Sequence, residues 1–259
     1  MKEFREIKSR ENSLIKLTSV LQSSSKERSE KGRFVLEGLR ICMDAFENGI
    51  RFDKLIISET AKMKYAQEIE KFSELAEECF ILPNSLFKKI SDTKTPQGII
   101  VIAKTNPVPP KIDPKGRYLG LENIQDPSNL GAAARTCEAL GVSGIILSKD
   151  SCDPYSPKSL RASMGTLLRL PVIILENFAD ELIKSGLTVY SCVVDKNAKP
   201  INSVKFNDGC VLLIGNEANG LTENTIKKSH ERITIPMKGK AESLNAAVAA
   251  SIAAWEMMK

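Results

Sequence analysis

The chain has 259 residues, of which 42% are hydrophobic and 27% charged, and its formal net charge is +5. This composition excludes disordered, collagen-like and coiled-coil proteins, and the length suits one large or two ordinary domains. No stretch approaches the roughly 18 consecutive apolar residues of a membrane span. The opening MKEFREIKSREN has no apolar core of the kind that a secretory signal needs. We therefore expect a cytoplasmic protein with no membrane segment.

The first hundred or so residues alternate between short β-branched runs and helical patterns, which is typical of a small α/β domain. Strands are predicted at 33–38, 54–58, 79–83 and 98–104, and helices at 39–49, 60–75 and 85–91. Basic residues between Lys2 and Arg40 are interleaved with glutamates. A solvated helix face and contact with phosphates explain that pattern equally well.

A proline-rich segment, KTNPVPPKIDPKG, marks the predicted domain border. Its prolines, Pro107, Pro109, Pro110 and Pro114, favour neither helix nor sheet. We place a first domain at 1–104, a linker at 105–116 and a second domain at 117–259.

The second domain continues the alternation with longer units. Strands are predicted at 118–123, 144–149, 170–175, 187–194, 210–215 and 232–236, and helices at 130–141, 157–165, 178–186, 222–229 and 243–259. Continuous apolar strands separated by helices predict a mainly parallel sheet covered on both faces. The fold class is therefore α/β in both domains.

Several common sites are disfavoured by what the chain lacks. The sequence has one histidine, His230, within a charged KKSHERI stretch, and its six cysteines form no CxxC pair. We therefore predict no metal site and no serine or cysteine nucleophile activated by histidine. Neither GxGxxG nor GxxxxGK[ST] occurs, which disfavours common dinucleotide and P-loop folds.

One unusual segment is DPSNLGAAART at 126–136. Pro127, followed by Ser128 or Asn129, can start a helix, and Arg135 then lies about two turns inside on an Ala/Gly face. An arginine among small side chains can approach a phosphate or hydroxyl closely. A capped helix with a solvated arginine is the plainer alternative and carries equal weight on these residues alone.

A second segment, LIGNEANGL at 213–221, ends a buried strand in Gly215 and places Glu217 in the following loop. Glycines allow close approach of backbone to a ligand, so the loop can line a cofactor pocket. An ordinary Asn-Gly turn at residues 219–220 is the alternative.

A third segment, IPMKGKAESLNAA, ends a strand at Pro236 and continues through a basic loop to Ser243 or Asn245, which can cap an alanine-rich helix. Free N–H groups at such a helix start favour an anionic ligand. The alanines at 246, 249, 250 and 253 indicate close helix packing, within the chain or between subunits.

Together these three segments resemble the ordered motifs of the SpoU/TrmH-type 2′-O-ribose RNA methyltransferases, of the SPOUT class. Residues 1–104 resemble, more loosely, the small RNA-binding substrate domain that many members carry. The resemblance implies S-adenosylmethionine as cofactor, a C-terminal trefoil knot, a homodimer with its active site near the subunit interface, and an RNA substrate. It also implies methylation of a ribose 2′-hydroxyl, in ribosomal RNA rather than in tRNA.

The resemblance also carries site residues onto this sequence. The catalytic group it implies consists of Arg135, Asn129, Glu217, Ser243 and Asn245. Gly215, Ile235 and Leu244 match the positions whose backbone holds the cofactor, and the neighbouring strand ends add Val193, Asp195, Asn216, Pro236 and Met237. Asn216 and Ala241 depart mildly from the family's usual small or apolar residues. Arg135 would polarise the ribose hydroxyl or accept its proton, and Glu217 and Asn245 would hold Arg135 and the ribose in register.

Other functions fit the same motifs. A tRNA ribose methyltransferase and a non-catalytic RNA-binding or ribosome-assembly protein are the alternatives, although intact Arg135, Glu217 and Asn245 argue against a scaffold. Base methylation is disfavoured by the Ser-Leu-Asn segment at 243–245. The physiological outcome, housekeeping modification or resistance to a ribosome-targeting antibiotic, is left open.

Overall fold

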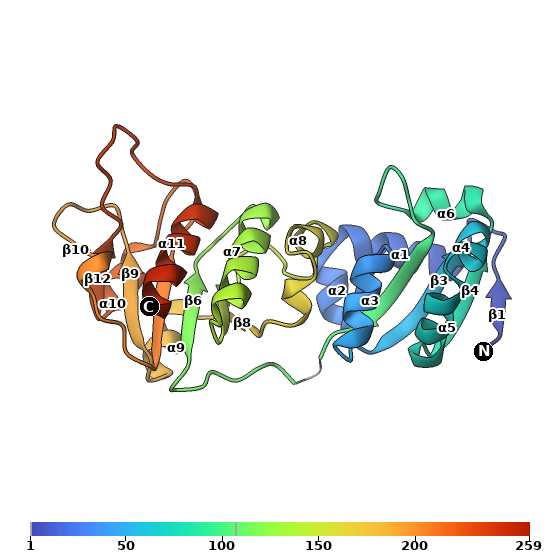
Figure 1. Ribbon diagram of the computed structural model, residues 1–259, viewed down its shortest axis with the longest axis horizontal. Coiled ribbons are helices and arrows are strands. Elements are labelled where there is room, and N and C mark those ends of the chain that lie inside the picture. Colours follow the sequence, from blue (N-terminus) through green and yellow to red (C-terminus); the bar gives the residue numbers. More distant parts are fainter. Residues whose placement is uncertain (1, 107) are drawn as a thin grey trace. The chain divides into compact units, whose positions relative to one another are not determined.

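The computed structural model describes residues 2–106 and 108–259 (Figure 1). Met1 of the first predicted domain and Pro107 of the predicted linker lie outside the described residues. The chain forms two compact units, Met1–Val108 with Tyr155–Arg161, and Pro109–Pro154 with Ala162–Lys259. The borders drawn from the sequence do not include the excursion at Tyr155–Arg161. Within the described residues, no helix is long and apolar enough to cross a lipid bilayer.

The first unit is built on a mixed five-stranded sheet. Its strands follow the order β1 (Phe4–Glu6), β4 (Glu78–Leu82), β3 (Phe52–Ser58), β5 (Ile99–Lys104) and β2 (Arg33–Glu37). β5 is antiparallel to both neighbours, whereas β1, β4 and β3 run parallel. The helices are α1 (Ser13–Ser23), α2 (Ser25–Lys31), α3 (Leu39–Glu47), α4 (Glu59–Lys64), α5 (Ala66–Leu75), α6 (Asn84–Ile90) and most of α8 (Pro157–Ala162).

Both faces of this sheet are buried. On one face, Leu21 of α1 and Phe87 of α6 join a core cluster with Ile56 of β3. Phe72 of α5 belongs to a separate aromatic group, with its ring centroid 5.9 Å from that of Phe52. The predicted α/β first domain is thus present, with helices packed against the sheet.

Three N-terminal elements, β1, α1 and α2, were missed, and the helix predicted at 60–75 is two helices that meet at Tyr65. The apolar positions of α1, Leu14, Ile15 and Leu21, are buried at helical spacing, which is a signal that the surrounding charges obscured. Asn12 caps that helix by accepting a hydrogen bond from Leu14 N–H at 2.9 Å.

The second unit is built on a seven-stranded sheet in which every neighbouring pair is parallel. Its order is β10 (Lys199–Pro200), β12 (Glu231–Thr234), β9 (Thr188–Cys192), β11 (Cys210–Ile214), β6 (Arg117–Leu121), β7 (Gly144–Ser148) and β8 (Val172–Leu175). The helices are α7 (Pro127–Leu140), α9 (Phe178–Lys184), α10 (Glu223–Lys228) and α11 (Ala246–Met258), with short 3₁₀ turns at Thr166–Leu168 and Ile201–Ser203. The predicted parallel sheet is confirmed.

Helices cover both faces of this sheet, as predicted. Phe178 of α9 packs with Val211 and Leu213 of β11 in one core cluster, and Ile226 of α10 lies against it. α7 and α11 lie side by side (Figure 1) and contact β7, β6 and β11. Because successive side chains of a strand point to opposite faces, Leu212 points away from the α9 cluster, toward the other layer.

The start of α11 and the ends of β9 and β12 differ from the predicted positions. α11 starts at Ala246, not at residue 243, because Asn245 caps it by accepting hydrogen bonds from Ala247 and Val248 N–H. Ser243 and Leu244 therefore belong to the preceding loop. β9 ends at Cys192 and β12 at Thr234, earlier than expected. The trefoil knot implied by the resemblance stays a prediction, since strand order alone does not report chain threading.

At Gly131, α7 approaches the carboxyl end of α8. A Cβ atom built on Gly131 would lie 2.5 Å from the Ala162 Cβ and 2.6 Å from the backbone N of Ser163. Overpacking costs about 1–3 kcal/mol, and alanine gains roughly 1 kcal/mol over glycine inside a helix. Because the closest clashes include backbone atoms, we expect the cost to dominate and Gly131→Ala to destabilise the second unit by up to about 2 kcal/mol.

Thermal unfolding of the purified variant checks this expectation. Gly239→Ala is the matched control, because nothing lies within 4 Å of a Cβ at that position. A Gly131→Ala protein as stable as the control would show that α7 can shift without cost.

Candidate active site

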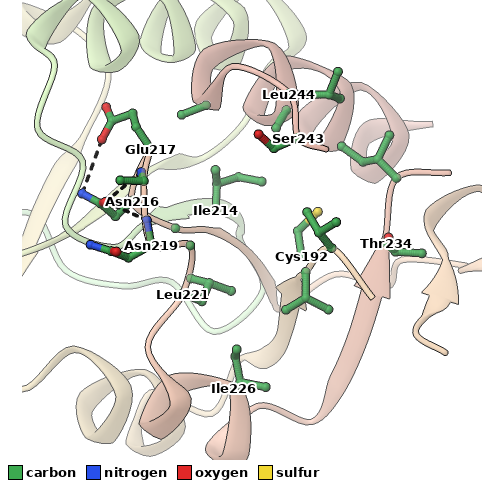
Figure 2. Close-up of a pocket in the computed structure, with 18 of the residues that line it drawn as sticks. Cys192, Ile214, Asn216, Glu217, Asn219, Leu221, Ile226, Thr234, Ser243 and Leu244 are labelled. Carbon is green, nitrogen blue, oxygen red and sulfur yellow. Dashed lines mark hydrogen bonds between the residues drawn. The ribbon is translucent and has the colours of Figure 1, made fainter. Parts of the chain in front are cut away.

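A cavity of about 430 Å³ lies at the carboxyl ends of β9, β11 and β12 (Figure 2). Carboxyl ends of parallel strands meet at one edge of the sheet, which is where open α/β sheets bind ligands. The structure brings most of the predicted cofactor residues together there. The lining includes Val193, Gly215, Asn216, Glu217, Ile235, Met237, Ser243 and Leu244.

Two of the predicted cofactor residues do not line this cavity. Pro236 is exposed. Asp195 turns its carboxylate to Arg232 at 3.3 Å and to the backbone N–H of Asn197 at 2.8 Å. The strand ends therefore predicted which segments border this cavity, but the side-chain directions at residues 195 and 236 depend on the turns that follow.

The apolar wall of the cavity was missed. Ile214, Leu221 and Ile226 line it, together with Cys192 at the end of β9. Burial raises the pKa of the Cys192 thiol to about 11, so this side chain is neutral at physiological pH. Cys192 and Ile214 could have been found from their place at the ends of apolar strands, whereas Leu221 and Ile226 lie in the following loop and in α10 and carry no such signal.

A tight loop, Gly215–Leu221, forms one side of the cavity. Asn216 and Gly220 exchange both backbone hydrogen bonds, at 3.0 and 2.9 Å. A Cβ on Gly215 would lie 2.0 Å from the backbone carbon of Gly220, so no other residue fits there. Gly220 itself has φ +68°, a conformation that glycine adopts without strain.

Glu217 connects this loop to the start of α7. Its Oε1 accepts hydrogen bonds from Asp126 N–H at 3.1 Å and from the Asn129 side-chain amide at 2.9 Å. Its Oε2 accepts a bond from Gln125 N–H at 3.2 Å. One carboxylate thus satisfies donors from three residues of the segment around Asp126, which caps α7 by accepting a hydrogen bond from Ser128 N–H.

Asn129 links Glu217 to the start of α11. Its Oδ1 accepts a hydrogen bond from the Asn245 amide at 3.0 Å, and the Oδ1 of Asn245 accepts the first free N–H groups of α11. Asn129 is 9% exposed, so its orientation is held by packing as well. The three predicted motifs meet in this chain of side chains, Glu217–Asn129–Asn245, which we call the polar chain.

The polar chain also sets the ionisation of Glu217. Burial raises the pKa of its carboxyl, but the Asn129 amide and nearby backbone N–H groups outweigh that effect and leave the pKa below its usual range. Glu217 is therefore a stable anion at neutral pH.

Arg135 stands apart from the polar chain. It is six residues beyond Asn129 on α7, which places it about 9 Å along the axis and roughly 120° around the helix. Its side chain is exposed, does not line the cavity, and has no hydrogen-bond or ion-pair partner within the described part of the chain. The expectation that Glu217 and Asn245 hold Arg135 is not met within one chain, because both hold Asn129 instead.

The histidine, His230, does not line the cavity. Its side chain is exposed, and its Nδ1 accepts a hydrogen bond from Val189 N–H at 3.0 Å. Across residues 2–106 and 108–259, no cluster of His, Cys, Asp and Glu could hold a metal ion.

Comparison with known families assigns both halves of the chain. Residues 116–255 match the SpoU rRNA Methylase family. Residues 12–101 match the MRM3-like substrate binding domain.

Relatives of similar length carry rRNA methyltransferase names. The chain is 29% identical over 256 residues to the 23S rRNA (guanosine(2553)-2′-O)-methyltransferase RlmP of Bacillus subtilis, covering 98% of this chain and 99% of that protein. It is 26% identical over 270 residues to the 23S rRNA (uridine(2479)-2′-O)-methyltransferase of Streptomyces viridochromogenes, covering 98% and 92%.

Solved structures agree with these relatives. The AdoMet-bound rRNA methyltransferase from Sinorhizobium meliloti superposes with a TM-score of 0.86 at 27% identity, over 98% of this chain and 97% of that one.

The lowered pKa of Glu217 predicts a pH-dependent role in stability. In Glu217→Gln an amide N–H₂ must face either the backbone N–H of Gln125 or the donors of Asp126 and Asn129, so we expect lower stability than wild type at pH 7. A carboxylate whose pKa is lower in the folded chain stabilises it above the unfolded value, about 4.3, and loses that effect as the pH falls through the folded value.

Urea unfolding of both proteins from pH 7 into acid measures the difference. Other carboxylates titrate in both proteins, so the difference isolates Glu217, and it should shrink as the pH falls. A difference that is constant with pH would show that the charge of Glu217 does not matter to the polar chain.

Proposed function

Since the chain belongs to the SpoU rRNA methylase family, we propose that it transfers the methyl group of S-adenosylmethionine to a ribose 2′-hydroxyl of ribosomal RNA. The observation that carries this proposal is the cavity at three parallel strand ends, bordered by Glu217 of the polar chain. Ribosomal RNA is preferred to tRNA because relatives that span nearly the whole chain are named for 23S rRNA. Cytoplasmic localisation is part of the same proposal.

The cavity suits this cofactor in size and chemistry. Its volume of about 430 Å³ falls in the roughly 300–1,000 Å³ range of small-molecule sites. Apolar side chains from Ile214, Leu221 and Ile226 offer a surface for an adenine ring. Asn216, Ser243 and the loop backbone offer polar partners for the ribose and amino-acid parts.

When bound, S-adenosylmethionine supplies an electrophilic methyl group. A ribose hydroxyl is a weak nucleophile, so the protein must orient it in line with that methyl group and favour loss of its proton. We assign orientation to the Asn129 and Asn245 amides and to Ser243, since the polar chain fixes both amides. The anionic Glu217 holds that chain in place.

Arg135 is assigned to the RNA. Its guanidinium is exposed and without a partner among the described residues, so its donors are available to a phosphate or the target hydroxyl. Arginine stays charged in proteins, which favours electrostatic polarisation over acceptance of the proton. Because Arg135 does not line the cavity of its own chain, we favour a site in which a second copy of the chain supplies this arginine.

A homodimer is therefore part of the proposal. α11 exposes Val248 and Trp255, at 47% and 55% of their surface, on one stripe next to α7. Exposed apolar side chains two turns apart on one stripe of a helix favour a two-fold interface. Of the two kinds of packing that the alanines allow, these favour the one within the chain, because Ala246, Ala250 and Ala253 are buried in its own fold.

The first unit is proposed as the RNA-binding substrate domain, in keeping with its family match. In the second unit, the loop after β12 extends away from the sheet (Figure 1). It carries Lys238 and Lys240, which are exposed and have no ion-pair partner in the described chain. Met237 and Ser243 of the same loop line the cavity, so both lysines are within reach of phosphates that flank a bound ribose.

Removal of Arg135 tests the catalytic assignment. Arg135→Ala should lower single-turnover methyl transfer from labelled cofactor to ribosomal RNA by about 100-fold or more, the usual scale for loss of a charge-stabilising group. Arg135→Lys should rescue poorly because a point charge does not replace the planar guanidinium. Cofactor affinity should not change, since Arg135 does not line the cavity.

Normal transfer by Arg135→Ala would remove the residue from the mechanism, and lost cofactor binding would make its role structural. Absence of transfer by wild type to unmodified ribosomal RNA, with transfer to tRNA, would change the substrate. Site-resolved 2′-O-methyl mapping of total RNA with and without the gene then locates the nucleotide.

The salt dependence of RNA affinity tests the loop lysines. Each lost phosphate contact lowers the slope of log affinity against log salt by roughly 0.7 to 0.9. Lys238→Ala and Lys240→Ala should each do so with an unmodified 23S rRNA transcript, without changing cofactor affinity.

Lys205→Ala is the control, because Lys205 is exposed and has no partner among the described residues but lies before β11, at the amino end of that strand. Equal slopes for all three variants would exclude a specific role for the loop.

A further inference from the structure

A second carboxylate, Glu122, is buried just beyond β6, where its side chain is 5% exposed. Its Oε2 accepts a hydrogen bond from Thr222 N–H at 2.8 Å. Its Oε1 accepts bonds from the hydroxyls of Thr222 at 2.9 Å and Thr225 at 2.6 Å. Thr222 is the cap of α10, so this carboxylate holds the first turn of that helix.

These contacts restrain the far end of the cavity loop Gly215–Leu221. Leu221 lines the cavity and is followed at once by Thr222, and Ile226, one turn into α10, also lines it. A movement of Thr222 would therefore displace two apolar contacts of the cavity.

The near end of the same loop is held by the neighbouring backbone. Glu122 N–H donates to Ile214 O at 2.9 Å, which extends the pairing of β6 with β11. The carbonyl of Asn123 accepts the Asn216 side-chain amide at 2.8 Å. Two consecutive residues, Glu122 and Asn123, thus hold both ends of the loop.

We infer that Glu122 is a positioning residue for cofactor binding, acting through Thr222 and Thr225 to keep the loop Gly215–Leu221 in its binding shape. This rests on the proposed function, since the ligand is S-adenosylmethionine. The physical reason is that a buried carboxylate with three donors permits little movement of any of them. Removal of the carboxylate leaves a void, and it leaves the buried Thr225 hydroxyl and the part-buried Thr222 hydroxyl without their acceptor.

Calorimetric titration with S-adenosylmethionine, well below the unfolding temperature, tests the inference. Glu122→Ala should weaken binding by about tenfold or more. Glu122→Gln should stay within about threefold of wild type, because its oxygen can accept Thr222 N–H and its amide can donate to hydroxyls that turn to accept.

Glu138→Ala is the matched control. Glu138 accepts hydrogen bonds from Arg169 Nε at 2.6 Å and from the Thr166 hydroxyl at 2.8 Å, and it does not line the cavity. Its removal should lower stability and leave cofactor affinity unchanged. A merely structural role for Glu122 predicts the same result for Glu122→Ala, which would overturn the inference.

Thr225→Val provides a second test if Glu122→Ala does not fold. It keeps the side-chain shape and removes one donor to Glu122, so we expect binding to weaken about threefold, with little further loss when combined with Glu122→Gln. Unchanged affinity in Glu122→Ala would refute the inference, and where Glu122→Ala does not fold, unchanged affinity in Thr225→Val would refute it. Wild type that binds no cofactor would refute the proposed function instead.

Discussion

The hydrogen bonds accepted by Glu217 are the interaction on which the site depends. Its carboxylate gathers donors from Gln125, Asp126 and Asn129, and Asn129 in turn holds Asn245 at the cap of α11. Three segments, with hydrogen-bonded partners up to 116 residues apart in the chain, therefore share one set of bonds. Because the anion is favoured there, the connection is strongest at neutral pH.

The cavity owes its place to a second constraint, the parallel arrangement of the sheet. β9, β11 and β12 are neighbours in space, and each ends at the same edge, so the loops that follow them converge. Both Glu122 and Glu217 restrain the loop Gly215–Leu221. Glu122 binds the start of α10, which follows the loop, and Glu217 lies within the loop and binds the start of α7. Neither restraint involves the exposed Arg135, which leaves that side chain available to the substrate.

Some features were readable from residues alone because they depend on short-range patterns. Apolar runs of β9, β11 and β12 followed by Gly215, Pro236 and similar turn residues indicated a parallel sheet with ligand loops at its edge. The motif resemblance placed Asn129, Glu217 and Asn245 in one site, and the structure brings them into contact. By contrast, α1 was missed because charged neighbours masked its apolar stripe, and the start of α11 was misplaced because Ser243 and Asn245 are both good caps.

The sequence by itself determined the α/β class, the parallel second sheet and the segments that form the cavity, since hydrophobic periodicity and turn residues act locally. Only the tertiary structure decided which polar side chains meet. Asp195 turned to Arg232, Glu122 turned to Thr222 and Thr225, and Asn129 bridged two helices, because these outcomes depend on donors brought close by strand order. The physical reason is that a buried polar group takes its partner from whatever the fold places within hydrogen-bond distance, and that distance is not encoded in spacing along the chain.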